Sequence, residues 1–388
     1  MSGRGPSPGR SGVPSGGGMR SSSGGQMRSP SVGEMRSPSG CEMIVPPYIL
    51  DAIARRGDAV ERARALETLL QTERLRGHRD AYGGVCPTVP AGEERRTVYD
   101  EAGSSVLPGR LVRGEAGRAS KDPAVNEAYD GAGATYEFYE KVFCRSSIDG
   151  KGMRLDSSVH YGRDFDNAFW NGTQMVYGDG DGRIFNRFTV ALDVIGHELT
   201  HGVTGMEANF DYESQPGALN ESFSDVFGSL VKQWNRRETV DQADWLIGAG
   251  LFTPKVRGRG IRSMLYPGTA YDDPVLGKDP QPATMKDYYD GYDDNGGVHV
   301  NSGIPNRAFA LAAVAIGGHA WEKAGAIWYT ALTERLRHTS DFNDAAATTI
   351  AVAAEMFGSS GAEEKAVREA WKAVGVSSAR RAAAAATA

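Results

Sequence analysis

A pair of histidines with a glutamate between them is the part of this chain best suited to chemistry. His197 and His201 stand four residues apart in the stretch His-Glu-Leu-Thr-His. In a helix, residues four apart lie one turn above the other on one face, so both imidazoles could reach the same tetrahedral ion. The preceding residues, Phe188–Gly196, follow an apolar helical pattern that would bury one flank. We therefore expect a helix over Val190–Val203 that turns two zinc ligands toward a cleft.

Two carboxylates follow about twenty residues further along the chain. Glu221 begins a second amphipathic run that extends to Val231, and Asp225 falls one turn after Glu221 on the same face. We predict Glu221 as the third ligand of one zinc ion per chain. Asp225 is then placed to hold the second ring nitrogen of a ligand histidine.

This set of residues suits metal-assisted hydrolysis. Three protein ligands leave the fourth position of zinc for a water, whose pKa the metal lowers toward neutrality. Glu198 would take the proton of that water and hand it to the leaving group, so its replacement should abolish turnover and spare zinc. A peptide carbonyl under attack develops negative charge, and His299, in a Gly-Gly-Val-His loop, is the best candidate donor to it.

Six segments, the His-Glu-Leu-Thr-His stretch among them, give the chain a family likeness. Over about Tyr99–Val376 it resembles the thermolysin family of gluzincin metalloendopeptidases, and more narrowly the protealysin-like branch with short precursors. The segments, in order, are Asn167–Gly172, Met175–Gly182, the His-Glu-Leu-Thr-His stretch, Gly217–Ser222, Arg262–Met264 and Asp294–Ile304. The resemblance implies an α+β fold of two lobes, with a β-rich amino-terminal lobe, a helical carboxy-terminal lobe and the zinc helix between them.

The resemblance also implies roles for residues outside the zinc helix. Tyr212 would join His299 in stabilising the developing charge, Asp294 would orient His299, and Arg262 would bind the substrate carbonyl beyond the cleaved bond. The Asn167 side chain and the Ala168 backbone would hold the peptide. The pocket for the residue after the cleaved bond would be lined by Phe185, Phe188, Val194 and Ile261.

Such a pocket favours bulky apolar residues, because burying a Leu or Phe side chain contributes roughly 1.5 to 3 kcal/mol. The expected function is therefore hydrolysis of peptide bonds on the amino side of bulky hydrophobic residues. The segment Asn167–Tyr177 reads as a strand that enters a hairpin at Gly178–Gly182 and offers an edge to an extended peptide.

The family's calcium sites look lost in this sequence. Asp193 and Asp244 fit the paired site, but Lys232, Leu246 and Ala249 stand where the resemblance would place further acids. Calcium needs six to eight oxygen ligands. The basic run Lys255–Gly260 replaces a second calcium loop, and a hairpin turn is the preferred interpretation of Gly178–Gly182. We expect little or no calcium dependence.

The remaining sequence divides around this core. Residues 1–40 are rich in Gly, Ser, Pro and Arg, repeat the motif Met-Arg-Ser and are predicted to be disordered. Residues 41–90 should form a short helical propeptide with a linker, because Pro46-Pro47-Tyr48 resembles the entry of protealysin-like propeptides. The first 90 residues carry a net charge of +4 and the others −10, which favours docking. The expected catalytic lobes are 91–215 and 216–376, followed by an Ala-rich tail, 377–388.

The expected partners are protein or peptide substrates and the chain's own propeptide, acting as an intramolecular inhibitor of a monomer. Nucleic acid is not expected. No stretch resembles a secretory signal or a membrane span, so synthesis in the cytoplasm, with export by another route, stays open. The three cysteines, Cys41, Cys86 and Cys144, are too few for a disulfide framework. Cys41 could ligate zinc in the precursor, although a free thiol is the usual case.

Two alternatives remain at this level. A zinc-stabilised, non-catalytic binding protein would have no use for Glu198, His299 and Arg262 together. A zinc exopeptidase would need a charged group that closes one end of the cleft, and the sequence shows no clear candidate.

Overall fold

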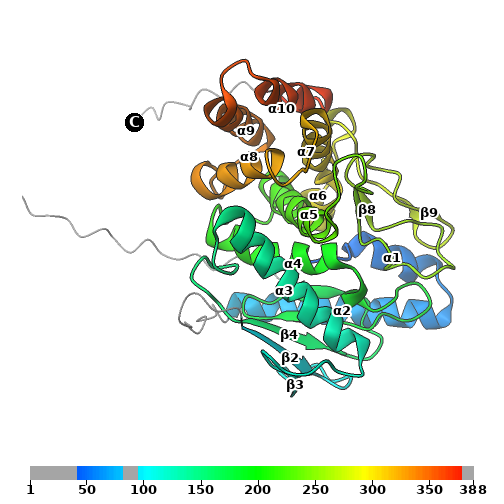
Figure 1. Ribbon diagram of the computed structural model, residues 1–388. Helices are drawn as coiled ribbons and strands as arrows, with labels where there is room; N and C mark the ends of the chain where they lie inside the picture. The colour runs from blue at the N-terminus through cyan, green and yellow to red at the C-terminus, as the bar shows by residue number, and fades with distance from the viewer. Residues whose placement is uncertain (1–41, 82–94, 378–388) are drawn as a thin grey trace, which may run out of the picture. The chain divides into compact units, whose positions relative to one another are not determined.

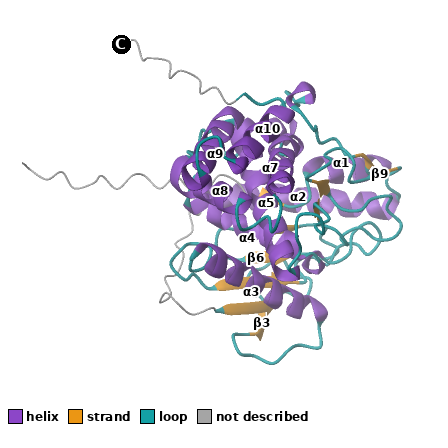
Figure 2. Cartoon of the chain, turned by 45° about the horizontal axis from the view of Figure 1, so that its top comes forward, coloured by secondary structure: helices purple, strands orange, loops and turns teal. Residues whose placement is uncertain are grey.

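The computed structural model describes residues 42–81 and 95–377. The predicted disorder of residues 1–40, most of the Ala-rich tail and two of the three cysteines, Cys41 and Cys86, lie outside these ranges. The described chain separates into a part built on a sheet and a part built of helices (Figures 1 and 2).

A six-stranded sheet forms the first part. Its order is β1-β5-β6-β4-β2-β3, with β4 parallel to β2 and to β6 and the other pairs antiparallel. One of the two outer strands is therefore β1, from the segment expected to be a propeptide. The bounds are β1 Glu42–Met43, β2 Arg96–Asp100, β3 Arg110–Arg113, β4 Leu155–Val159, β5 Ala168–Trp170 and β6 Met175–Tyr177.

Two helices lie between this sheet and the helical part. Helix α3 (Pro123–Phe143) contacts β2 and β4, and α4 (Leu192–Met206), which follows a 3₁₀ turn at Phe188–Val190, contacts β5 (Figure 1). α4 also packs along α5 (Ser214–Arg236). The α4 helix, which carries the two histidines, thus runs between the two lobes, as the fold prediction stated.

The helical part contains the rest of the long helices. They are α6 Asp293–Asn301, α7 Gly303–Ile316, α8 Ala324–Thr330 with a π-helical turn at Ala331–Arg335, α9 Phe342–Phe357 and α10 Ala362–Ala373. Between α5 and α6 lie two small strand pairs and a 3₁₀ turn: β7 Leu246–Ile247 with β8 Arg262–Ser263, β9 Asp272–Asp273 with β10 Gly277–Lys278, and Met285–Asp287. The α+β architecture of the prediction is confirmed.

The amino-terminal segment is a pair of helices that joins the main core. Pro46 and Pro47 start α1 (Pro47–Arg56), since proline suits the first turn of a helix, and α2 follows at Ala59–Ala81. Ile49, Leu50 and Ile53 are at most 1% exposed and belong to the same hydrophobic cluster as the core of α4 and α5.

Two local features differ from what the sequence predicted. The amino-terminal lobe, expected to be β-rich, also contains the long helix α3, which is capped by Asp122, whose side chain accepts a hydrogen bond from the Ala124 amide. The hairpin turn falls between β5 and β6, where Asn171 Oδ1 accepts from the Thr173 and Gln174 amides. The expected turn at Gly178–Gly182 is instead a loop.

Candidate metal centre and active site

Close approach of α4 and α5 brings the two halves of the zinc motif together. A Cβ added to Gly228 would lie 2.4 Å from the Asp193 carbonyl oxygen, and one added to Gly196 would lie 3.0 Å from the Gly228 Cα. Neither distance leaves room for a side chain. The two glycines therefore let the backbones meet, so that side chains from both helices point into one buried site.

Three side chains converge at this crossing. The Nε2 atoms of His197 and His201 are 3.0 Å apart. Glu221 Oε2 lies 3.6 Å from His197 Nε2, and Glu221 Oε1 lies 3.7 Å from His201 Nε2. Among the described residues, these three form the group of His, Cys, Asp and Glu side chains whose atoms could share a metal ion. All three are buried.

The hydrogen bonds at the two Nδ1 atoms fix the tautomers of His197 and His201. His197 Nδ1 lies 2.8 Å from Asp225 Oδ1, and His201 Nδ1 lies 3.0 Å from Asn220 Oδ1. Because these oxygens accept, each Nδ1 carries the proton and each neutral ring directs its Nε2 lone pair toward the other. Burial lowers the pKa of His197, which opposes a charged ring.

This arrangement fits a zinc ion. Two lone pairs that face one another at 3.0 Å repel unless a cation lies between them. Glu221 Oε2, although buried, has no hydrogen-bond partner among the described residues. An orphaned buried carboxylate oxygen is costly unless a metal takes it. Two imidazoles and a carboxylate are also the donor set of known catalytic zinc sites.

Behind the histidines lies a buried ion pair. Arg262 donates from Nε to Asp225 Oδ2 at 2.8 Å and from Nη2 to Asp225 Oδ1 at 2.7 Å, and Asn306 donates to Asp225 Oδ2 at 2.8 Å. Burial alone would raise the pKa of Asp225, but Arg262 and His197 together lower it below the usual value. Asp225 therefore stays ionised while it holds both the histidine and the arginine.

Glu198 lies beside the metal ligands on α4 and faces the sheet. Its Oε2 accepts a hydrogen bond from the Trp170 amide of β5 at 3.1 Å, and the side chain is fully buried. The contact joins the predicted base to the strand predicted to hold the substrate.

On the opposite side, a tyrosine and a histidine face Glu221. The Tyr212 hydroxyl donates to Glu221 Oε1 and lies 3.3 Å from His299 Nε2. Asp294 accepts twice from His299, from Nδ1 at 2.6 Å and from the amide at 2.9 Å. Burial opposes the charge on His299, but Asp294 and Glu221 outweigh it and raise its pKa.

A left-handed turn makes the contact between Asp294 and His299 possible. Asp294, Asn295, Gly296 and Gly297 all have positive φ, between 50° and 77°. At Gly297 a Cβ would lie 2.5 Å from a ring carbon of Tyr289. The glycines of the Gly-Gly-Val-His loop therefore let it fold back, so that the aspartate reaches a histidine five residues later.

The segment 43–45 lies in this cleft as an added strand. Met43 pairs with Phe169, and the Ile44 amide donates to the Ala168 carbonyl at 3.3 Å. Asn167 accepts from the Val45 amide at 2.9 Å and donates to the Val45 carbonyl at 3.2 Å. The residues predicted to hold a peptide thus hold the chain's own amino-terminal segment.

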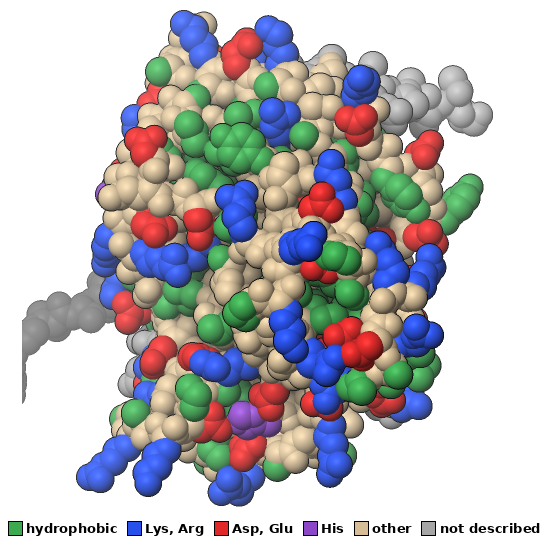
Figure 3. Space-filling model, turned by 90° about the vertical axis from the view of Figure 1, so that its right-hand side faces the viewer, with side chains coloured by type: hydrophobic (Ala, Val, Ile, Leu, Met, Phe, Trp, Pro, Cys, Tyr) green, Lys and Arg blue, Asp and Glu red, His purple; other side chains and the backbone are tan. Residues whose placement is uncertain are grey.

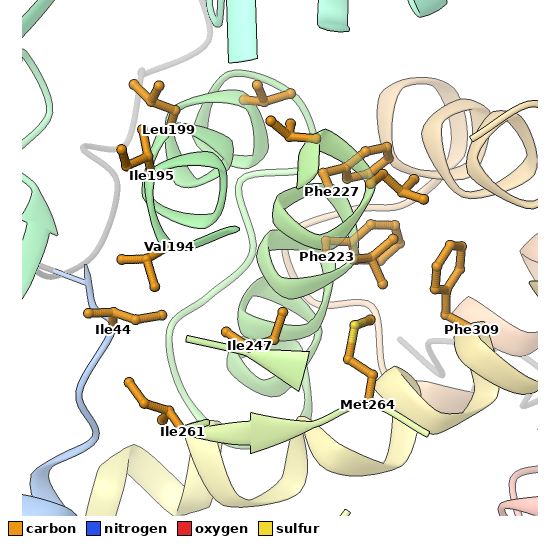
Figure 4. Packing of buried hydrophobic residues seen from close by; sticks show 14 of the residues in the cluster. Ile44, Val194, Ile195, Leu199, Phe223, Phe227, Ile247, Ile261, Met264 and Phe309 are labelled. Carbon is orange, nitrogen blue, oxygen red and sulfur yellow. The ribbon is translucent and has the colours of Figure 1, made fainter. Parts of the chain in front are cut away.

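Two more hydrogen bonds reach the same segment from the helical part. Arg262 Nη1 donates to the Ile44 carbonyl at 3.1 Å, and His299 Nε2 lies 3.1 Å from the Met43 carbonyl oxygen. Figure 4 shows the Ile44 side chain beside Val194 and Ile261. All three are buried in one cluster.

Phe185 and Phe188, the other two residues predicted for the pocket, are buried in that same cluster. Their ring centroids are 5.5 Å apart, and Phe185 also packs against Phe252 at 5.6 Å. The rings of Phe185, Phe188 and Phe252 thus pack together within that cluster.

Sequence reasoning missed four of the site's contacts. Asn220, Ser224 and Asn306 support His201 and Asp225, and the Trp170 amide contacts Glu198. Asn220 and Ser224 directly precede Glu221 and Asp225 and stand four residues apart, so they share a face of α5 beside the predicted carboxylates. That spacing was an available signal. Asn306 and Trp170 carried none, because only the fold brings them to the site.

Comparisons with known proteins match both halves of the chain. The family model described as the thermolysin metallopeptidase catalytic domain covers residues 91–205, and that of the thermolysin metallopeptidase alpha-helical domain covers residues 208–376. Within the described ranges, no helix has the length and apolar character needed to cross a membrane.

Individual relatives match the sequence of this chain along most of their own length. An extracellular metalloprotease of Pectobacterium carotovorum subsp. carotovorum is 52% identical over 86% of this chain and 96% of its own. The protease PrtS of Photorhabdus sp. is 46% identical over 86% of this chain and 91% of its own. The solved precursor of protealysin from Serratia proteamaculans is 52% identical, with a TM-score of 0.80, and the match covers 87% of this chain and all of that one. The chain therefore belongs to the thermolysin family of zinc metalloendopeptidases and, like protealysin, is made as a precursor with a propeptide.

Proposed function

We propose that this zinc metalloendopeptidase cuts peptide bonds on the amino side of bulky hydrophobic residues, and that its own residues 41–90 inhibit it as a propeptide. One observation carries the proposal: Ile44 lies against Val194 and Ile261, while its amide and carbonyl bond to Ala168 and Arg262 (Figure 4). An apolar side chain held by both of its peptide groups is what a substrate residue needs on the far side of a cleaved bond.

The first group of residues binds the metal and activates the attacking water. His197, His201 and Glu221 hold the zinc, and Asp225 keeps His197 in the tautomer that can bind it. Zinc, when bound, supplies Lewis-acid activation of water and of the substrate carbonyl. Glu198 takes a proton from the attacking water and later delivers it to the leaving amine.

The second group acts on the substrate. His299 and Tyr212 donate to the carbonyl oxygen as it gains negative charge, and Asp294 holds His299 in place for this step. Arg262 grips the carbonyl after the cleaved bond. Because Asp225 holds two of the Arg262 nitrogens, the same carboxylate orients both a metal ligand and a substrate donor.

Inhibition within the chain is supported by the way residues 43–53 fill the cleft. Met43 and Ile44 take up main-chain contacts of β5, Val45 bonds to the Asn167 side chain, and the apolar face of α1 is buried behind them. Arg183 bonds to Asp58, which lies between α1 and α2, and to Glu61 of α2, which ties the segment to the catalytic part. We propose that the two catalytic lobes are residues 91–215 and 216–376.

A monomer without structural calcium is the simplest form of this enzyme. Lys232 Nζ lies 2.8 Å from both Asp193 Oδ2 and Asp244 Oδ1, so an ammonium group occupies the space between the two acids that fit a calcium site.

On the face drawn in Figure 3, basic and acidic side chains are interspersed rather than gathered by sign, which favours peptide over nucleic-acid partners.

The test compares the full chain with its Glu198→Ala variant. Both should bind one zinc per chain, and only the wild type should shorten itself and then cleave a quenched peptide with Gly-Leu at its centre, before Leu. Equal zinc with no cleavage by either protein, even after removal of the first 90 residues, would make the zinc structural and refute the catalytic proposal.

A further inference from the structure

We propose that the Met43–Ile44 peptide bond is itself a cleavage site, which the enzyme cuts within its own chain. This inference rests on the proposed function, because it assigns to the same site a specific substrate. The propeptide would then be a bound substrate as well as a cover.

The register of the segment is the first argument. The bond between Met43 and Ile44 has its carbonyl oxygen 3.1 Å from His299 Nε2, the donor proposed for the developing charge. On its other side, the Ile44 amide donates to Ala168 at 3.3 Å, and the next carbonyl accepts from Arg262 at 3.1 Å. The contacts proposed for His299, Ala168 and Arg262 with a substrate are therefore made by this one bond and its neighbours.

The side chains are the second argument. Ile44 is fully buried beside Val194 and Ile261, in the pocket proposed for the residue after the cleaved bond (Figure 4). A shift of the strand by one residue would turn Ile44 to the other face, since side chains alternate along a strand. Asn167 bonds to both peptide groups of Val45 and holds the register against such a shift.

The position of the base is the third argument. Glu198 Oε2 accepts from the Trp170 amide, and Trp170 is the strand partner of Glu42, the residue just before Met43. β1 also contacts α4, the helix of Glu198. The proposed base thus lies on the same side of β5 as the bond that it would help to cut.

The reaction is an ordinary hydrolysis. The oxygen of water adds to the Met43 carbonyl carbon, the bond from that carbon to the Ile44 nitrogen breaks, and the nitrogen takes up the proton that Glu198 held. The products are a carboxylate at Met43 and an amino group at Ile44, with no co-reactant beyond water and the zinc of the proposed function.

The cut separates the start of the chain from the inhibitor without removing the inhibitor. After cleavage, residues 44–81 keep their anchors in the catalytic part, because Ile49, Leu50 and Ile53 stay buried and Arg183 still holds Asp58 and Glu61. Of the described residues before the cut, Glu42 and Met43 keep the short pairing of β1 with β5, and the Met43 side chain stays buried in a cluster with Tyr161 and Phe169. The expected product is therefore a chain that begins at Ile44 and still has its cleft partly filled.

The experiment follows the amino termini of the full chain by intact mass and terminal sequencing after zinc is added. Four variants accompany the wild type: Glu198→Ala, Ile44→Asp, Ile44→Leu, and Leu70→Asp as a matched control. Leu70 is 57% exposed on α2, so the control introduces the same charge into the propeptide away from the cleft.

The wild type, Ile44→Leu and Leu70→Asp should yield products that begin at residue 44, at a rate independent of protein concentration. Ile44→Asp should do so at least tenfold more slowly, and Glu198→Ala not at all. A wild type that cleaves the Gly-Leu peptide but never shows a terminus at Ile44 would overturn this inference and leave the proposed function standing. A wild type that cuts neither would overturn both.

A second measurement tests, without turnover, whether Ile44 anchors the propeptide segment in the cleft. In the metal-free Glu198→Ala chain, hydrogen exchange of the amides at Ile49–Ile53 should be at least tenfold faster with Ile44→Asp than without it, and unchanged by Leu70→Asp. Equal protection in all three proteins would show that Ile44 does not hold the segment in the cleft, and would overturn the register argument.

Discussion

Removing the buried ammonium of Lys232 should destabilise the catalytic part by about 3 kcal/mol. Lys232 Nζ donates to Asp193 Oδ2 and Asp244 Oδ1, each at 2.8 Å, and to the Leu246 carbonyl at 2.7 Å. Burial opposes the charge, but the two carboxylates outweigh it and hold the pKa of Lys232 above its usual value. The substitution Lys232→Met keeps the apolar stem and removes the ammonium group with its three hydrogen bonds.

The size of the effect follows from what each partner loses. Asp244 is 34% exposed, so water can solvate it once the lysine is gone. Asp193 is 1% exposed, its Oδ1 has no hydrogen-bond partner among the described residues, and its Oδ2 would keep the Gly248 amide at 3.3 Å. Breaking a buried ion pair costs about 3–5 kcal/mol. Because only one of the two carboxylates is buried here, we expect a loss of stability at the lower end of this range, about 3 kcal/mol.

The assay is thermal unfolding in the Glu198→Ala background, where self-digestion should not interfere. A loss of about 3 kcal/mol should lower Tm by about 6 to 12 °C for a unit of this size. The double variant Lys232→Met with Asp193→Asn should regain at least half of that loss, since no buried charge is left unpaired.

Two results would refute this reasoning. One is a loss for Lys232→Met no larger than that for Lys151→Met, which removes an exposed lysine. The other is a rise in the Tm of the parent protein on addition of calcium, because the ammonium would then not have replaced the ion.

Three further predictions concern the outer contacts of the site and the propeptide. Asp225→Asn should lower zinc affinity about 10- to 100-fold in a chelator competition, and unchanged affinity would contradict its role. His160, held between Asp179 and Asp122 at 2.8 and 2.7 Å, has its pKa raised to about 9, so its stabilisation is complete below about pH 6.5 and lost above pH 9. His160→Gln should therefore lower Tm at pH 6 more than at pH 10. Arg183→Ala should speed the onset of activity up to about fivefold, because a surface ion pair contributes about 0–1 kcal/mol.

The zinc ligands could be predicted because their geometry is local. A spacing of four residues in a helix fixes that His197 and His201 share a face, and the same rule pairs Glu221 with Asp225. The crossing of the two helices then depends on Gly196 and Gly228, which the sequence contains but whose contact it does not reveal. The structure brings these side chains together at that crossing.

Other features depend on contacts between distant residues. Arg262 was predicted to bind substrate, and it does contact a peptide carbonyl, but its bidentate pairing with Asp225 could not be read from residues 37 positions apart. Helix α3 was missed because its glycines and tyrosines weaken its local preference for a helix. One of those glycines, Gly131, faces Ile195, where a Cβ would lie 2.4 Å from the side chain, so packing against α4 requires it.

The binding position of residues 43–45 likewise could not be predicted from the sequence. The Pro-Pro-Tyr entry suggested a propeptide, yet the hydrogen bonds of Val45 to Asn167 join residues 122 positions apart. Only the fold shows which peptide bond faces His299.

The central claim is that one zinc ion, held by His197, His201 and Glu221, makes this chain a peptidase. The most direct test removes zinc from the processed enzyme and restores it in steps, with bound zinc and cleavage of the Gly-Leu peptide measured in the same samples. Activity should rise in proportion to bound zinc and stop rising at one ion per chain, while His201→Ala should retain neither zinc nor activity. Full cleavage by zinc-free protein, or full activity in His201→Ala, would contradict the account.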